Sequence, residues 1–208
     1  MTEDNGMTED NGMPMDDGLL AAAVRLFSDL GYDTVDTEML AGASGISADA
    51  LNREYGGKRR IYQAAFVHAA GACLDHMEAA MTRPVQGPER AMFLFDEYLN
   101  YSIANPQIAG LWMQRWMADA SDLPNMEQSF GGVPVFKQWS AEIEKIVADD
   151  MDAAMTLRML VWMINTFVRG GYVGVDGHRY TADEADAVDQ FRDHLHMTIK
   201  YLARRSGR

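Results

Sequence analysis

Residues 31–61 contain the feature that most restricts how this chain can fold: two short helical segments joined by a tight turn. Asp36 is a candidate N-cap, and the apolar residues after it recur at helical spacing. Gly45 supplies a turn residue that tolerates positive φ, and Ser47 is placed to cap the next helix. The pattern predicts a helix-turn-helix.

The second helix of this pair runs from Ala48 to about Tyr55. Its spacing predicts that Leu51 and Tyr55 are buried and that a polar face points outward, made of Asp49, Asn52 and Arg53. A short helix with a free polar face, held against another helix by a glycine-containing turn, can enter the major groove of DNA. We therefore expect a DNA-binding regulator.

This stretch resembles the tetracycline-repressor (TetR) family. The residues that fall on the family pattern are Gly31-Tyr32, Leu40-Ala41, Gly45-Ile46-Ser47, Leu51, Tyr55, Lys58 and Ile61, and the run Leu19–Phe27 resembles the family's first helix. The resemblance implies an all-α fold, with a three-helix DNA-binding domain at residues 17–62 and a helical ligand-binding and dimerisation domain at 63–208. It also implies base reading by the second helix and phosphate contacts at the start of the next one. The expected DNA-binding residues are Ser47, Ala48, Asp49, Ala50, Asn52, Arg53, Lys58 and Arg59.

Three residues depart from the family pattern within the proposed reading helix: Asp49, Asn52 and Glu54. Carboxylates that face a polyanion are repulsive, so these replacements predict weaker DNA binding with a smaller salt dependence. Asp49 has an alternative role, because a carboxylate can accept a hydrogen bond from the amino group of cytosine. The sequence leaves both readings open.

The chain has 208 residues and a formal net charge of −13, and its proposed DNA-binding part is itself acidic, which counts against tight, promiscuous DNA binding. Residues 17–62 hold seven acidic and five basic residues, and three of the basic ones are consecutive, Lys58-Arg59-Arg60. Residues 1–16 begin with the tandem repeat MTEDNG-MTEDNG and are acidic, so we expect a disordered extension. It is either a duplication without a role or an acidic arm that competes with DNA for the basic residues.

Cys73 is the only cysteine, which excludes an intrachain disulfide and favours a reducing, cytoplasmic location. The N-terminus is acidic and lacks the apolar core of a signal peptide. The longest apolar run, Met159–Ile164, is far too short to span a membrane. We therefore expect a soluble protein.

After Ile61 the pattern is helical throughout, with no convincing alternating strand. A loop is expected at 120–134, and Gly170-Gly171 is expected to end a strongly apolar helix. Thr181 and Glu184 have capping-box spacing at the start of the last helix. The expected helices after this point cover residues 58–82, a segment from Pro88, and residues 108–119, 135–147, 151–168 and the C-terminal segment.

The helix at 151–168 is apolar around most of its circumference, so it must be covered on two sides. One side can face its own core and the other a second subunit. In the TetR family the last two helices form a four-helix bundle with the partner's pair, and this pair resembles that arrangement. A symmetric dimer fits a palindromic operator, because reading heads about 34–36 Å apart meet successive major grooves.

Aromatic and methionine side chains are concentrated in the second half of the chain. Trp112 and Trp116 share a helix face, as do Met113 and Met117. An adaptable apolar pocket can be built from these side chains, although the same residues can simply fill the core. The candidate ligand-binding residues are Phe95, Tyr98, Trp112, Met113, Trp116, Met117, Met159, Trp162, Met163 and Phe167, with Arg115 or Gln114 as the polar contact.

Catalytic and metal-binding patterns are not found in the sequence. His194 and His196 point to different faces of a helix, and His68 and His76 lack carboxylate or cysteine ligands at suitable spacing. Nucleophile elbows and phosphate-binding glycine loops are also missing, so we expect neither an enzyme nor a cofactor. The sequence favours a dimeric repressor that a small apolar or aromatic effector releases from its operator. The alternative is a family member that has lost DNA binding and acts as a small-molecule or protein-binding partner.

Overall fold

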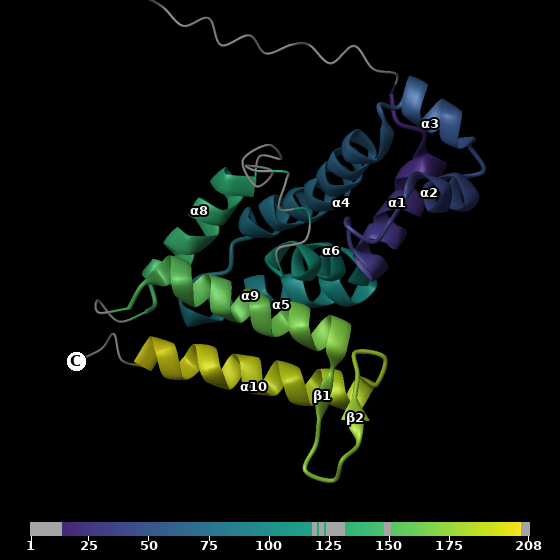
Figure 1. The fold of residues 1–208 in the computed structure, drawn as a ribbon. Helices are drawn as coiled ribbons and strands as arrows, with labels where there is room; N and C mark the ends of the chain where they lie inside the picture. Colours follow the sequence, from purple (N-terminus) through teal and green to yellow (C-terminus); the bar gives the residue numbers. More distant parts are fainter. Residues whose placement is uncertain (1–13, 118–119, 121–122, 124–131, 148–150, 205–208) are drawn as a thin grey trace, which may run out of the picture.

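The computed structural model describes residues 14–117, 120, 123, 132–147 and 151–204. The first three helices are short and lie together at one end: α1 (Asp17–Leu30), α2 (Thr37–Ser44) and α3 (Ala48–Glu54). The long helix α4 (Gly57–Met81) leads from them into a helical body (Figure 1). The body contains α5 (Pro88–Ala104), α6 (Pro106–Trp116), α8 (Gly132–Glu144), α9 (Ala153–Gly170) and α10 (Ala185–Arg204). The predicted all-α architecture is confirmed.

The helix ends follow the local chemistry of the sequence. The Asp36 carboxylate caps α2 by accepting from the Met39 N–H at 2.8 Å, and Gly45 ends that helix with φ 74°. Asp152 caps α9 in the same way, by accepting from the Met155 N–H at 2.9 Å. Gly171 ends α9 with a positive φ, as expected from the glycine pair.

The core of the first three helices is aromatic and aliphatic and continues into the body. Phe27 of α1 packs edge-on against Tyr62 of α4, with ring centroids 4.9 Å apart. Phe66 continues the series and packs edge-on against Trp112 of α6 at 5.0 Å. Helix α4 crosses the expected domain boundary at residue 62 without interruption, so one continuous helix belongs to both parts.

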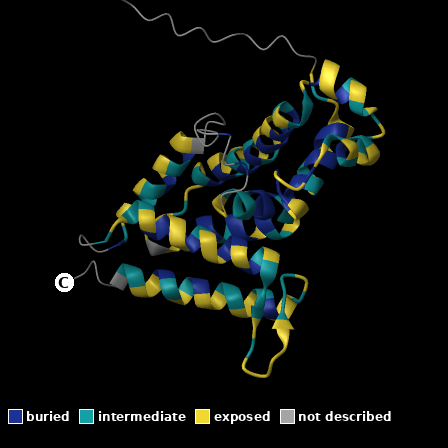
Figure 2. Cartoon of the chain, in the orientation of Figure 1, coloured by how far each residue is buried: buried dark blue, intermediate teal, exposed yellow. Residues whose placement is uncertain are grey.

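Polar side-chain contacts help to hold the body helices in place. Arg192 of α10 donates to Asp96 of α5 at 2.8 Å, and His196 contacts the same carboxylate at 2.9 Å. Arg90 of α5 donates to Glu142 of α8 at 2.7 Å. Figure 2 shows buried positions on the inner sides of α1, α5 and α6, and exposed positions along α9 and α10.

A short β-hairpin between α9 and α10 contradicts the expectation of no strand. Strands β1 (Tyr172–Val173) and β2 (Arg179–Tyr180) pair antiparallel, with Tyr172 opposite Tyr180. The two tyrosine rings stack at 5.1 Å, and Gly177 in the turn has φ 79°. Strands of two residues are too short to produce an alternating pattern, which explains why periodicity missed them.

Other boundaries shift by a few residues. Helix α8 begins at Gly132, inside the segment expected to be a loop, and the rest of that segment is outside the described residues apart from Ala120 and Leu123. Helix α6 begins at Pro106 and ends at Trp116, whereas 108–119 was expected. Residues 1–13 of the expected disordered extension are outside the described residues. Asp16, the last residue of that extension, caps α1 by accepting from the Leu19 N–H at 3.0 Å.

Candidate DNA-binding surface and ligand groove

Helix α3 has one buried and one exposed side, as its sequence predicts. Leu51 is fully buried and Tyr55 is 8% exposed, which fixes the helix against α2 and α4. The Ser47 hydroxyl caps the helix by accepting from the Ala50 N–H at 3.3 Å. The exposed residues of the helix are Asp49, Asn52, Arg53 and Glu54, whereas Ala48 and Ala50 are half-buried.

The turn between α2 and α3 is held by Ser44 and Gly45. The Ser44 hydroxyl donates to the Leu40 carbonyl at 2.7 Å and accepts from the Ile46 N–H at 3.3 Å. Gly45 takes a left-handed conformation that a residue with a Cβ adopts only at a cost. These contacts set the angle at which α3 leaves α2, and therefore how its polar side is presented.

The start of α4 lies directly after α3 and carries the basic residues. Gly56 and Gly57 both have positive φ, at 75° and 72°, and no side chain caps this helix end. The Lys58 ammonium lies 4.2 Å from the centre of the Tyr32 ring, and the Arg59 side chain is exposed. The positive end of the helix dipole and these cations favour an anion at this position.

The expected ligand-binding residues are divided among three places. Phe95 and Tyr98 are core residues whose rings contact Trp139 of α8, at 4.9 and 5.5 Å. The Tyr98 hydroxyl donates to the Asn165 side-chain carbonyl at 3.0 Å, and burial raises its pKa, so it acts as a neutral donor. These two aromatic residues are part of the packed interior.

A second group lies along α6. Trp112 and Trp116 stack at 6.1 Å, Met113 is half-buried, and Met117 at the end of the helix is 68% exposed. Arg115, one of the two expected polar contacts, donates to the carbonyls of Ala120 and Leu123, at 2.6 and 2.7 Å. Arg115 therefore holds the chain after α6 in place.

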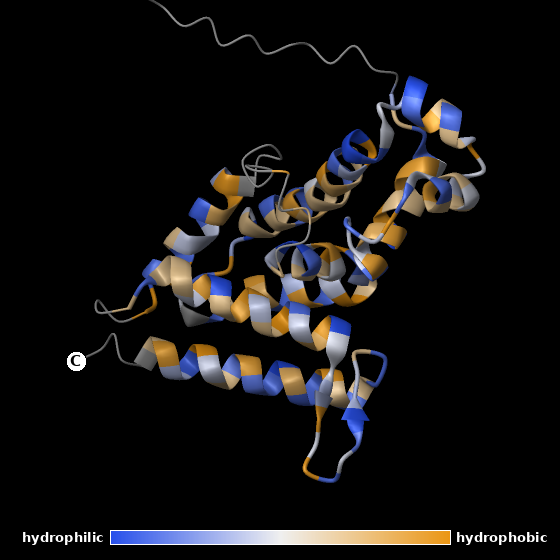
Figure 3. Cartoon of the chain, viewed as in Figure 1, coloured by the Kyte–Doolittle hydropathy of each residue, from blue (hydrophilic) through white to orange (hydrophobic). Residues whose placement is uncertain are grey.

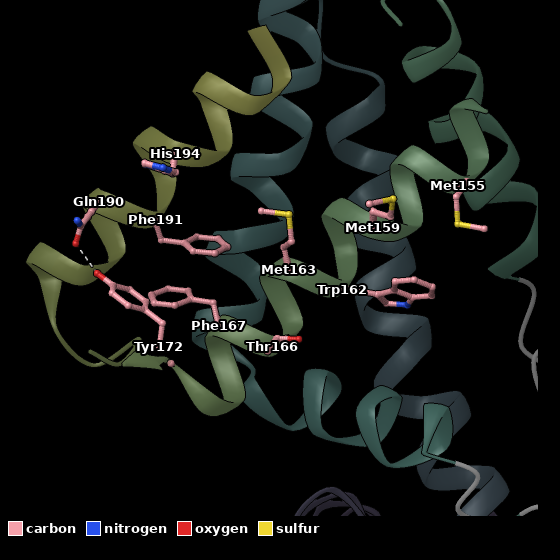
Figure 4. Close-up of a pocket in the computed structure, with 11 residues that line it drawn as sticks. Met155, Met159, Trp162, Met163, Thr166, Phe167, Tyr172, Gln190, Phe191 and His194 are labelled. Atoms are coloured by element: carbon pink, nitrogen blue, oxygen red, sulfur yellow. Dashed lines mark hydrogen bonds between the residues drawn. The ribbon is translucent and has the colours of Figure 1, made fainter. Parts of the chain in front are cut away.

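The third group lines a groove between α9 and α10, with a volume of about 790 Å³ (Figure 4). Four of the expected residues take part: Met159, Trp162, Met163 and Phe167. The sequence did not identify the other wall, because the apolar positions of the last helix were assigned to a dimer bundle. Met155, another methionine that the sequence offered for an apolar pocket, also lines the groove, and the lining residues that were missed are Thr166, Gly171, Tyr172, Gln190, Phe191 and His194.

In the part of the chain that the structure describes, the remaining titratable groups form neither a metal site nor a reactive thiol. Within the described residues, no group of three His, Cys, Asp or Glu side chains is arranged to hold a metal ion. His196 contacts Asp96 and His76 contacts Glu97, each histidine meeting a single carboxylate. Burial raises the pKa of the Cys73 thiol to about 12, which opposes nucleophilic reactivity. Every helix in the described ranges is too short or too polar to cross a membrane.

Comparisons with known proteins agree with this arrangement. Residues 19–65 match the sequence model of the family described as bacterial regulatory proteins, tetR family. Comparison with curated proteins gives no match. Among solved structures, the TetR-family regulator PfmR from Thermus thermophilus aligns at a TM-score of 0.61 and 20% identity, over 90% of this chain and 96% of that one.

Two further structures are similar over most of their length. A regulatory protein of the tetR family from Rhodococcus RHA1 aligns at a TM-score of 0.66 and 14% identity, over 89% of this chain and 95% of that one. The ketosteroid transcriptional regulator KstR2 of Mycobacterium tuberculosis aligns at a TM-score of 0.60 and 14% identity, over 89% of this chain and 93% of that one. At sequence identities of 14–20%, the similarity to these solved structures establishes the fold alone.

The helix-turn-helix segment therefore belongs to the tetR family of bacterial regulatory proteins, and the whole chain has the fold of TetR-family transcriptional regulators. This combination is that of a DNA-binding transcriptional regulator.

Proposed function

We propose that this chain is a homodimeric repressor that binds a palindromic operator and is released by a small apolar or aromatic effector. One observation carries the proposal: the polar side of α3 is exposed, while Leu51 and Tyr55 on the opposite side are buried and anchor the helix. An anchored helix with a free polar side, followed at once by cations, is the arrangement that reads bases and grips phosphate.

The expected contacts divide by position. Asn52 and Arg53 are the exposed side chains most able to reach base edges, since arginine pairs with guanine and asparagine with adenine. Asp49 can accept from cytosine. Lys58 and Arg59 hold phosphate at the start of α4, where the helix dipole adds to the attraction. The remaining proposed contacts come from the cap and small residues of α3: Ser47, Ala48 and Ala50.

A second copy is proposed to cover α9 and α10. Large apolar side chains are exposed along both helices, and Figure 3 shows the hydrophobic colouring recurring on each of them. Exposed apolar patches of this kind mark interaction sites. The residues concerned are Met155, Met159, Trp162, Met163, Met197 and Tyr201, each more than 40% exposed. Such a dimer holds two α3 helices at a fixed separation, which an effector can change and thereby favour release.

A salt titration of binding to random duplex DNA tests the DNA-binding part of the proposal. Measurable affinity at low salt that falls as salt rises is expected, because phosphate contacts release counterions. We predict that Arg53→Ala weakens binding to a selected operator by about 1–3 kcal/mol and relaxes preference at the base it contacts. Equal operator affinity of the variant and its parent would show that Arg53 does not read a base.

The charge of α3 supports a second candidate function. Asp49 and Glu54 are both exposed beside the proposed reading face, and the whole chain carries a formal net charge of −13. Under this alternative the protein has lost DNA binding and acts as a small-molecule or protein-binding partner. A complete lack of binding to duplex DNA at low salt, by folded protein, favours the alternative.

A further inference from the structure

The floor of the α9–α10 groove is made by stacked aromatic rings. Phe167 of α9 and Phe191 of α10 project towards each other, with centroids 4.2 Å apart and planes within 6° (Figure 4). Tyr172 extends the floor and donates a hydrogen bond to the Gln190 side chain. Met163, 41% exposed, lies in the same groove and supplies a flexible apolar side chain.

The lining chemistry restricts what the groove can bind. None of the described residues that line it is Lys, Arg, Asp or Glu, and its polar groups are the neutral side chains of Thr166, Tyr172 and Gln190 together with His194. A carboxylate or phosphate would lose its hydration without meeting a lysine or arginine there. The volume, about 790 Å³, is within the range of small-molecule sites. The groove therefore suits a neutral, largely aromatic molecule with one or two hydrogen-bonding groups.

The same end of α9 is tied to the DNA-binding helices. Arg169 lies between the groove residues Phe167 and Gly171 in sequence, and its guanidinium reaches back to α1. It donates to the Asp29 carboxylate at 3.1 Å and to the Ser28 carbonyl at 3.3 Å. The Arg169 side chain is 29% exposed and that of Asp29 is 51% exposed, so solvent screens much of this ion pair and its value is as a positional link rather than as a source of stability. The last turn of α9 thus contacts both the groove and α1.

From the end of α1 the contacts continue towards the basic start of α4. The Tyr32 ring follows α1, lies 4.8 Å from Tyr62, and receives the Lys58 ammonium at 4.2 Å. These contacts connect the last turn of α9 to a cation that we assign to phosphate contact. A packed core can transmit a shift of that turn, because it has little free space to absorb it.

We propose that the α9–α10 groove is the effector site, that it takes a neutral aromatic molecule, and that Arg169 relays its occupancy to α1. This inference rests on the function proposed above, because it specifies where and how the effector acts. Phe95 and Tyr98 are not part of this proposed effector site, because both are packed in the core. The second copy proposed on this face then closes the groove, and the bound molecule lies at the subunit interface.

The binding step is tested with N-phenyl-1-naphthylamine, a neutral aromatic dye that fluoresces in apolar surroundings, on the full-length protein. We expect saturable binding, and binding at least about tenfold weaker for the same ring system bearing a sulfonate, 8-anilinonaphthalene-1-sulfonate, because no lysine or arginine lines the groove to pair with an anion. Equal or tighter binding of the sulfonated dye would contradict the proposed ligand class.

Glutamate substitutions locate the dye. Met163→Glu places a carboxylate in the groove, and a loss of about tenfold or more in dye affinity is expected. Met117→Glu is the matched control, because it places the same carboxylate outside the groove. Tyr201→Glu is the control for a weakened dimer. Tyr201 is 61% exposed on the face of α10 proposed to contact the second copy, and it does not line the groove. Light scattering measures the oligomeric state of each variant. A Met163→Glu affinity no weaker than that of both controls would overturn the site.

The relay is tested by DNA affinity with and without saturating dye. In the parent protein the dye is expected to weaken binding of a selected duplex by about fivefold or more. Arg169→Met is expected to bind the dye and the duplex but to lose this response, whereas Arg158→Met, the same change elsewhere on α9, keeps it. An Arg169→Met response equal to the parent's would refute the relay, and a parent that binds the dye without a response would refute the effector role.

Failure of this inference is distinguishable from failure of the proposed function. If the folded parent binds no duplex DNA at low salt, the repressor proposal fails, while the dye measurements still decide whether the groove is a ligand site. If DNA binding is normal and the dye does not bind, or binds equally well in Met163→Glu and both controls, only the groove assignment fails.

Discussion

Gly110→Ala is predicted to separate α1 from α6 at the place where the DNA-binding helices meet the body. A Cβ at this buried position would lie 2.2 Å from the Ser28 hydroxyl, 2.9 Å from the Ser28 carbonyl oxygen and 3.1 Å from the Arg169 Nε. Ser28 is fully buried, and one of the contacts is to its backbone, so the neighbours cannot simply rotate away. The two helices must move apart.

Two opposing effects set the magnitude. Alanine in place of glycine within a helix stabilises by about 1 kcal/mol. Overpacking a well-packed core costs about 1–3 kcal/mol, and the short contacts here place Gly110→Ala at the upper end of that range. The net expectation is a destabilisation of about 1–2 kcal/mol, which for a chain of this size lowers Tm by about 2–8 °C.

Thermal unfolding followed by circular dichroism measures the effect, and Ser28→Ala provides the control. The Ser28 hydroxyl is buried and has no hydrogen-bond partner among the described residues, so Ser28→Ala alone is expected to be neutral or slightly stabilising. In the double variant the closest contact is gone and part of the lost Tm returns. A higher Tm for Gly110→Ala than for the parent would refute the reasoning, because helix propensity would then outweigh the close approach.

Three further predictions concern the start of α4, a helix cap and the buried thiol. Lys58→Ala should weaken binding to random duplex DNA and reduce the slope of log affinity against log salt by about 1, and an unchanged slope in the titration would remove Lys58 from the phosphate contacts. Asp152→Ala removes the cap of α9 and should lower the free energy of unfolding in urea by about 1 kcal/mol, whereas an unchanged midpoint would show that the cap is dispensable. Burial raises the pKa of Cys73 to about 12, so the folded protein holds the thiol proton that the unfolded chain loses above about pH 8.5. The contribution of the protonated thiol to the free energy of unfolding is complete below that pH and is lost as pH rises towards 12, at no more than about 1.4 kcal/mol per pH unit. The free energy of unfolding of Cys73→Ala should therefore fall less steeply with alkaline pH than that of the parent. Equal slopes of the free energy of unfolding against pH in the two proteins would contradict this.

Local sequence chemistry predicted the helix-turn-helix in detail. Caps and turns depend on residues three or four positions apart, so Asp36, Gly45 and Ser47 could be assigned roles that the structure confirms. The burial of Leu51 and Tyr55 followed from the helical period in the same way. Such features need no knowledge of the rest of the fold.

Contacts between distant segments could not be predicted in this way. The sequence grouped the aromatic and methionine residues as one set, but their division among the core, α6 and the groove depends on how α9 and α10 both pack against α5. Arg169 and Asp29 are 140 positions apart, and no local pattern links them. Arg115 was available as a ligand contact from sequence alone, until the carbonyls of Ala120 and Leu123 proved to be its partners.

Selection of bound duplexes from a random DNA pool, carried out with the full-length protein, tests the central claim most directly. If α3 reads bases from a symmetric dimer, the recovered sequences should share two inverted half-sites whose centres are separated by about one turn of the double helix or a multiple of it. The Arg53→Ala variant should recover sequences with relaxed preference at one position of each half-site. Recovery of no enriched sequence by folded, dimeric protein at low salt would contradict the account.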